Sequence, residues 1–175
     1  MRLAIPERSL VVLIGPSGAG KSTFARRDFK PTEVVSSDTC RGLVSDDEDN
    51  MAATEDAFTV LHLITAKRLA AGKLTVVDAT NVQPESREPL LALAQQQNVA
   101  AVAIVFHLPE DLCRDRNSAR RDRQTGSQVI RQQSQQLRRS MPWLQLEGFR
   151  QVFVLSSPEE VEAARVVREP VETLR

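Results

Sequence analysis

Residues 15–22, with the sequence GPSGAGKS, constrain this chain more than any other segment. They match the phosphate-binding P-loop pattern, in which backbone N–H groups wrap around phosphate oxygens at the N-terminus of a helix. The apolar run at 10–14 predicts a buried strand before the motif, and residues 23–27 predict the start of a helix after it. The motif therefore has the strand, loop and helix context that a triphosphate site requires.

Each part of this motif has a physical role. Glycines let the backbone approach the phosphates closely, Lys21 brings a positive charge to the β- and γ-phosphates, and the Ser22 hydroxyl helps to hold Mg²⁺. We therefore predict a nucleoside triphosphate as phosphate donor, accompanied by Mg²⁺ or Mn²⁺. The predicted donor-binding residues are Gly15, Ser17, Gly18, Gly20, Lys21, Ser22 and Thr23.

Length and composition are compatible with one cytoplasmic domain. A chain of 175 residues can bury a core large enough to fold alone, and its 23 basic and 23 acidic residues balance. Cys40 and Cys113 show no metal-ligand spacing, which favours a reducing compartment. No apolar stretch approaches the ~20 residues of a membrane span, and no signal peptide is recognisable, so we expect no membrane partner.

Apolar runs alternate with helical patterns and predict an α/β fold. Such alternation is typical of a mainly parallel five-stranded sheet flanked by helices, here the P-loop NTPase fold. In such sheets ligands bind beyond the carboxyl ends of the strands, so Gly15, Asp38 and Asp78, which each follow a predicted strand, should share one rim. Strands are predicted at 10–14, 33–37, 74–77, 100–108 and 151–155, and helices include 51–71, 85–97 with Pro89 disturbing its start, 128–140 and 158–168.

The residues expected at this rim favour phosphoryl transfer. The Asn-Lys-x-Asp and Asp-x-x-Gly signatures of GTPases are absent from the sequence. A phosphotransferase needs a base for the acceptor hydroxyl, and Asp38 is the candidate, although it could instead cap a helix. Arg41 could hold an acceptor phosphate or the Asp38 carboxylate, or form a purely structural salt bridge. Asp78 could serve in the magnesium shell or pair with a lid arginine.

An arginine-rich stretch follows the fourth predicted strand. Arg116, Arg120 and Arg123 are spaced four and three residues apart, so on a helix they would project from one face. A solvated helix face is the simpler interpretation. Nucleotide kinases, however, place a mobile lid here, whose arginines stabilise the transferring phosphoryl group. We therefore predict an Arg-rich helical lid.

Taken together, residues 15–23, 36–41 and 76–81 and the lid arginines resemble the 5′-OH polynucleotide kinase family, over essentially the whole chain. The resemblance is closest to the kinase domain of the bacterial polynucleotide kinase-phosphatases of RNA repair. It implies transfer of the γ-phosphate of ATP, GTP or another nucleoside triphosphate to the 5′-OH end of single-stranded RNA or DNA.

The resemblance also implies residue roles. Lys21 and Ser22 would bind phosphates and metal. Asp38 would activate the 5′-OH, and Arg41 would contact the 3′-phosphate of the acceptor. The lid arginines would be Arg116, Arg120 and Arg123.

The family also suggests a domain organisation. Its kinase domain is followed by phosphatase and ligase-like domains, whose activities these residues do not imply. We expect a kinase domain over residues 1–170 and a tail over 171–175, with the polar stretch 168–172 resembling the start of a linker in an excised domain.

Three alternatives would use the same motif. A kinase of a small hydroxylated metabolite or antibiotic, or of a nucleotide sugar, would differ mainly in its acceptor pocket. A non-catalytic nucleotide-binding module would bind the triphosphate without transferring phosphate. The density of arginine favours a polyanionic acceptor. Aromatic stacking platforms are scarce, since we interpret Trp143 and several of the six Phe as packing residues.

Overall fold

The computed structural model describes residues 1–121 and 125–171, and its main sheet contains the predicted strands. They are β2 (Ser9–Ile14), β3 (Val34–Ser36), β4 (Thr75–Asp78), β5 (Ala100–Phe106) and β6 (Gln151–Leu155). Their order across the sheet is β3-β4-β2-β5-β6, and each neighbouring pair is parallel. The predicted five-stranded sheet is confirmed, and all four pairings in it are parallel.

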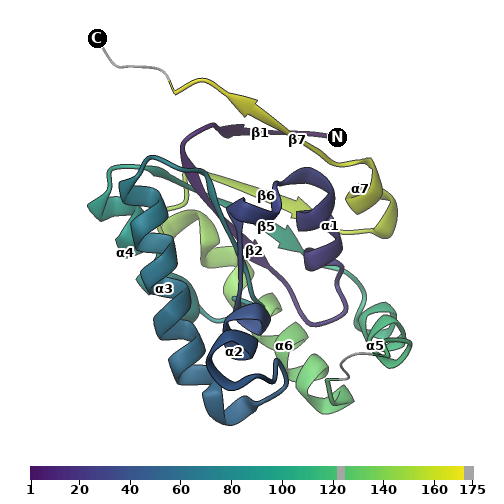
Figure 1. The fold of residues 1–175 in the computed structure, drawn as a ribbon. Helices are drawn as coiled ribbons and strands as arrows, with labels where there is room; N and C mark the ends of the chain where they lie inside the picture. Colours follow the sequence, from purple (N-terminus) through teal and green to yellow (C-terminus); the bar gives the residue numbers. More distant parts are fainter. Residues whose placement is uncertain (122–124, 172–175) are drawn as a thin grey trace.

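Helices cover both faces of this sheet (Figure 1). Alternate side chains of β2 enter two different cores, because successive residues of a strand point to opposite faces. Leu10, Val12 and Ile14 pack with α3 (Thr54–Ala70) and α4 (Pro84–Gln96). Val11 and Leu13 pack with α1 (Lys21–Asp28) and with the region of α7 (Pro158–Ala163). β2 is therefore buried on both sides, as a central parallel strand must be.

Three further helices, α2 (Ser37–Ser45), α5 (Glu110–Ser118) and α6 (Ser127–Ser140), gather near the carboxyl ends of the strands (Figure 1). Short 3₁₀ turns are η1 (Pro31–Glu33), η2 (Met51–Ala53) and η3 (Met141–Leu146). The later start that Pro89 suggested for the 85–97 helix is wrong, because α4 begins at Pro84 and runs through Pro89. The first turn is irregular, as expected: the Ser86 N–H donates to the Gln83 carbonyl at 3.1 Å, a 3₁₀-type contact. In the described part of the chain, no helix is long and apolar enough to cross a membrane.

A second, two-stranded sheet was not predicted. β1 (Arg2–Pro6) pairs in parallel with β7 (Arg165–Glu169). The predicted helix at 158–168 is therefore wrong in its second half: Ala164 is extended, and the Arg165 N–H donates to the Met1 carbonyl at 2.9 Å. The start of the stretch interpreted as a linker belongs to this strand.

An ion pair between Glu33 of η1 and Arg168 of β7 links the small sheet to the rest of the fold. Arg168 donates one hydrogen bond to each Glu33 carboxylate oxygen, both at 2.7 Å. Burial alone would raise the pKa of Glu33, but hydrogen bonds from Arg168 and from the Lys30 N–H outweigh it, so the pKa lies below its ordinary value. On the neighbouring helix, Arg27 donates to the Ala164 carbonyl at 2.5 Å. These contacts join β7 to η1, and Ala164, directly before β7, to α1.

Candidate active site

The P-loop connects β2 to α1, as the sequence predicted. The Gly15 N–H donates to the Thr80 carbonyl after β4 at 2.9 Å, which ties the loop to the neighbouring strand. Gly18 and Gly20 have φ angles of 82° and 93°, in the left-handed region that glycine adopts without strain. α1 then begins at Lys21. The glycine spacing of the motif thus matches the turns that the loop makes.

Strand register brings the predicted sites to one rim. Asp78 at the end of β4 is in register with Leu13 of β2 and with Ser36 of β3. The Ser22 hydroxyl donates to Asp78 Oδ2 at 2.6 Å. Asp78 is buried, whereas Ser22 is exposed. The expected clustering at the carboxyl ends of the strands is therefore present.

Ser22 and Asp78 fit a hard divalent cation. A hydroxyl and a carboxylate are oxygen ligands of the kind that Mg²⁺ and Mn²⁺ take, with phosphate oxygens and water completing the shell. Within residues 1–121 and 125–171, no group of three or more His, Cys, Asp or Glu side chains could hold a metal alone. Of the two roles considered for Asp78, its contact with Ser22 favours the metal shell.

Lys21 lies against the loop that contains it. Its Nζ donates to the carbonyls of Gly15 at 2.7 Å and Pro16 at 2.9 Å, and its side chain is buried. Burial lowers the pKa of Lys21 below its ordinary value. The ammonium therefore lies inside the P-loop, where two neutral carbonyl groups accept its hydrogen bonds.

Ionisable groups from four other elements and loops lie close enough to affect the pKa of Lys21. Asp78, Cys113 and Asp38, in that order, oppose the lowering of the lysine pKa, whereas Arg120 adds to it. Burial in turn raises the pKa of the Cys113 thiol. The end of β4, the first turn of α2, the helix α5 and the loop that follows α5 thus converge on one electrostatic site.

Asp38 lies in the first turn of α2, and it does not cap the helix. The N-cap is Ser36, whose hydroxyl accepts from the Thr39 N–H at 3.3 Å. Arg41 Nη1 donates to Asp38 Oδ1 at 2.7 Å, and Arg41 Nε donates to Thr54 Oγ1 at 3.2 Å. The arginine side chain is only 7% exposed, against 33% for Asp38. A buried guanidinium therefore orients a carboxylate that remains accessible from solvent.

The lid differs from its prediction in one respect. α5 ends at Ser118, so Arg116 lies on the helix but Arg120 lies beyond it, and the two do not share one helix face. Arg123 lies outside the described residues. The Arg116 guanidinium lies over the P-loop: its Nη1 is 3.7 Å from the position that a Cβ on Gly20 would occupy.

Asn117, near the end of α5, contacts Thr125 through two hydrogen bonds. Its Nδ2 donates to the Thr125 carbonyl at 2.6 Å, and its Oδ1 accepts from the Thr125 N–H at 3.0 Å. These two hydrogen bonds hold Thr125, which lies just before α6, next to the last turn of α5. Sequence reasoning missed Asn117, because a polar residue among arginines carries no signal that its amide is buried.

Two other residues near the site were missed. Gln133 of α6 accepts the Ser17 N–H with its Oε1 at 2.9 Å. Arg87 of α4, fully buried, donates to the Asn81 carbonyl at 2.7 Å and pairs with Glu147. The contacts of Gln133 with Ser17 and of Arg87 with Glu147 are long-range, so no local pattern could reveal them.

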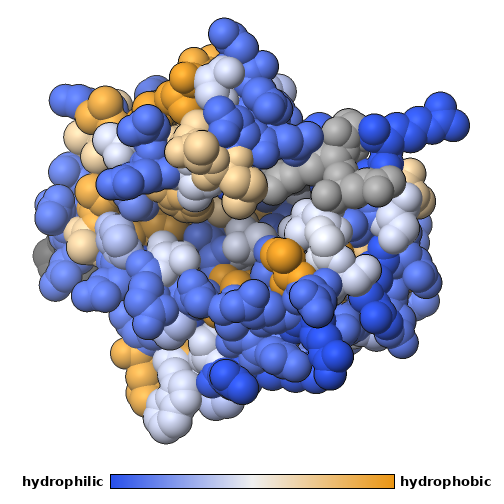
Figure 2. All heavy atoms as spheres, turned by 90° about the horizontal axis from the view of Figure 1, so that it is seen from below, coloured by the Kyte–Doolittle hydropathy of each residue, from blue (hydrophilic) through white to orange (hydrophobic). Residues whose placement is uncertain are grey.

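The surface at this end of the sheet is mostly hydrophilic, with separate apolar patches (Figure 2). Leu43, Met51 and Val129, on the elements near the rim, are exposed. Trp143 is 62% exposed, so its interpretation as a packing residue is wrong. The four buried phenylalanines, by contrast, are Phe24, Phe29, Phe106 and Phe149.

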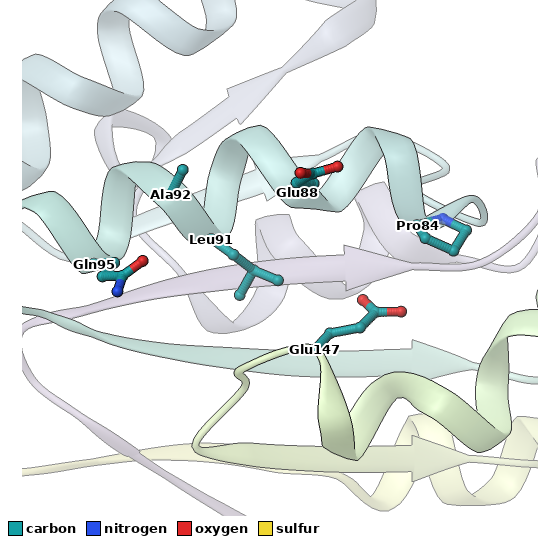
Figure 3. Close-up of a pocket in the computed structure, with 6 residues that line it drawn as sticks. All are labelled: Pro84, Glu88, Leu91, Ala92, Gln95 and Glu147. Atoms are coloured by element: carbon teal, nitrogen blue, oxygen red, sulfur yellow. The ribbon is translucent and has the colours of Figure 1, made fainter.

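Two hollows lie away from the P-loop. One, of about 390 Å³, runs along α4 and is bordered by Leu91 and Glu147 (Figure 3). The other, of about 930 Å³, includes Arg8 and Ala100 at the amino ends of β2 and β5. Neither contains the charged groups that converge on Lys21. The candidate site is therefore the rim around the P-loop.

Replacing Gly18 with Ala should destabilise the protein by at least about 1–2 kcal/mol. A Cβ at this position would overlap the Cys113 carbonyl oxygen and lie 3.0 Å from its carbonyl carbon, and φ is positive. α5 and the P-loop would have to separate. Gly126→Ala is the matched control, because a Cβ there has no atom within 4 Å and φ is −59°. Urea denaturation measures the free energy of unfolding of both variants. Equal values for the two would contradict the close packing at Gly18.

Comparisons with known structures agree with this fold. A chain of the Pnkp1/Rnl/Hen1 RNA repair complex superimposes with a TM-score of 0.68 at 22% identity, covering 79% of this chain and 46% of that one. This protein thus spans less than half the length of that chain. A gluconokinase from Sinorhizobium meliloti has a TM-score of 0.56 at 16% identity, covering 90% and 87% of the two chains. A shikimate kinase from Acinetobacter baumannii, in complex with shikimate, has a TM-score of 0.54 at 16% identity, covering 87% of each.

These likenesses, at low identity, establish a kinase-type P-loop fold. The fold found by these comparisons therefore agrees with the resemblance to polynucleotide kinases that the sequence indicated. A family model described as AAA domain matches residues 10–144, which include the P-loop, Asp38, Asp78 and Arg116. The chain belongs to this AAA domain family of P-loop proteins.

Proposed function

We propose that this protein transfers the γ-phosphate of a nucleoside triphosphate to the 5′-OH end of single-stranded RNA or DNA. One observation carries the proposal: an accessible carboxylate, Asp38, is held by the buried Arg41 and lies close enough to affect Lys21 of the P-loop. The candidate base thus lies near the proposed donor site. That is the arrangement a phosphotransferase needs.

On the donor side, the P-loop residues would bind the triphosphate. Lys21 would leave the Gly15 and Pro16 carbonyls for the β- and γ-phosphates, and the P-loop N–H groups would surround the phosphate oxygens. Ser22 and Asp78 would hold Mg²⁺, which neutralises the charge that develops on the phosphates.

On the acceptor side, Asp38 would take the proton of the 5′-OH. As the hydroxyl oxygen forms its bond to the γ-phosphorus, the bond from that phosphorus to the bridging oxygen breaks and a nucleoside diphosphate leaves. Arg116 and Arg120 would stabilise the charge on the moving phosphoryl group, and Arg123 would assist them. Arg41 would keep Asp38 in place and contact the phosphate that follows the first nucleotide.

Two features support a polynucleotide acceptor. The sequence around the lid is rich in arginine, which suits a polyanion. The fold is also shared with a chain of an RNA repair complex. The fold is also shared with a gluconokinase and a shikimate kinase, which makes a kinase of a small hydroxylated molecule the second candidate.

A transfer assay separates these candidates. The protein would be incubated with Mg²⁺ and γ-labelled ATP or GTP, and offered 5′-OH RNA, 5′-OH DNA, gluconate or shikimate. We expect label on the 5′-OH oligonucleotides, and none on the same oligonucleotides already carrying a 5′-phosphate. Label on a small molecule alone would replace the acceptor assignment. Triphosphate binding without any transfer would leave a nucleotide-binding module.

A further inference from the structure

Gln133 occupies a hydrogen-bonding position that the P-loop motif assigns to phosphate. Its Oε1 accepts the Ser17 N–H at 2.9 Å, from a helix 116 residues later in the chain. Ser17 lies inside the loop between Gly15 and Gly20, where N–H groups are expected to surround phosphate oxygens. A single N–H cannot donate fully to two acceptors. The Gln133 amide oxygen and a phosphate oxygen are therefore alternatives at this position.

Other groups of the loop that are predicted to bind phosphate or metal also have hydrogen-bond partners. Lys21 Nζ donates to two carbonyl oxygens of the loop, and the Ser22 hydroxyl donates to Asp78. Those partners come from the loop itself or from the adjacent strand. Gln133 differs because it belongs to α6, on which the neighbouring residues Ile130, Ser134 and Leu137 are buried. The contact thus joins a packed helix directly to the donor site.

We propose that Gln133 competes with the donor triphosphate for the P-loop and so sets the affinity of the protein for its donor. Before the donor binds, the neutral amide oxygen holds the Ser17 N–H. A charged phosphate oxygen makes a stronger hydrogen bond to the same N–H, so the donor displaces the side chain. Gln133 is then a residue that tunes donor binding and takes no part in the transfer of the phosphoryl group.

The competition predicts the sign of two substitutions. Gln133→Met keeps the length of the side chain but removes the acceptor, and water can reach the half-buried Ser17. Donor affinity should then rise, by about 2- to 10-fold for one hydrogen bond. Gln133→Glu should lower donor affinity by at least about tenfold, because a carboxylate accepts the N–H more strongly and repels the phosphates. That loss should shrink as salt is added.

Calorimetric titration of the purified protein, in the presence of Mg²⁺, tests both substitutions. The probes are inorganic tripolyphosphate and the β,γ-imido analogues of ATP and GTP. Matched controls are Gln135→Met and Gln135→Glu, since Gln135 is exposed and lies about 200° around α6 from Gln133. We expect the controls to bind as the unmodified protein does. Thermal unfolding shows whether each variant is folded, and Gln133→Asn, whose amide is too short to reach, replaces the Met variant if that variant does not fold.

Two outcomes would overturn the inference. Weaker binding by Gln133→Met would make the side chain a ligand of the donor, and unchanged binding would show that the contact has no energetic weight. The inference concerns the donor and holds whichever hydroxyl accepts the phosphate. If the Gln133 variants change donor affinity in the expected directions but the protein transfers no phosphate to oligonucleotides, only the proposed function is overturned.

Discussion

Replacing Asp38 with Asn is expected to lower the rate of phosphoryl transfer about 10²- to 10⁴-fold, while affinity for the triphosphate changes little. Asparagine keeps the shape of the side chain and an oxygen that can still accept from Arg41, which donates to Asp38 Oδ1 at 2.7 Å. It cannot take the proton of the acceptor hydroxyl. The donor side of the site, formed by Lys21, Ser22 and Asp78, is left intact.

Single-turnover measurements with saturating donor separate this loss of rate from a loss of binding. Asp46→Asn is the matched control: it removes the same charge at an exposed position with φ of 59°, where asparagine is well tolerated. Its transfer rate should be close to that of the unmodified protein. If Asp38→Asn transferred phosphate at the normal rate, the Asp38–Arg41 pair would be structural and another group would be the base.

Replacing Arg87 with Met should lower the free energy of unfolding by about 3–5 kcal/mol. The guanidinium is fully buried and donates to both carboxylate oxygens of Glu147, at 2.7 and 2.5 Å, and to the Asn81 carbonyl at 2.7 Å. Methionine would leave the Glu147 carboxylate, 16% exposed, without its counter-charge. The close-up of α4 shows this carboxylate turned toward the helix (Figure 3).

A double variant tests the cause of that loss. Arg87→Met combined with Glu147→Met should recover most of the stability, because neither charge then remains buried without a partner. Arg114→Met is the control for an exposed pair: Arg114 and Asp111 are 41% and 83% exposed, so the expected cost is at most about 1 kcal/mol. Urea denaturation gives all three values. A double variant as unstable as the single one would show that packing around Arg87, rather than charge, determines the loss.

The sequence located the P-loop, Asp38 and Asp78 correctly, but it misplaced one of the lid arginines. The P-loop, Asp38 and Asp78 were located because each follows an apolar strand, and parallel strands bring their carboxyl ends together. Arg120 was misplaced, because a four-residue spacing assumes a continuous helix and α5 ends at Ser118. Near that end Asn117 makes two hydrogen bonds with Thr125, a contact that the spacing of the arginines does not predict.

The sequence by itself determined the five parallel strands, most of the helices and the phosphate-binding loop, because burial periodicity and glycine spacing are local properties of a chain. Only the tertiary structure decided that residues 165–169 form a strand, since β7 exists through its pairing with β1 at the other end of the described chain. The same holds for the contacts of Arg87 with Glu147 and of Gln133 with Ser17. Each depends on a partner at least 60 residues away, and no local pattern encodes the identity of such a partner.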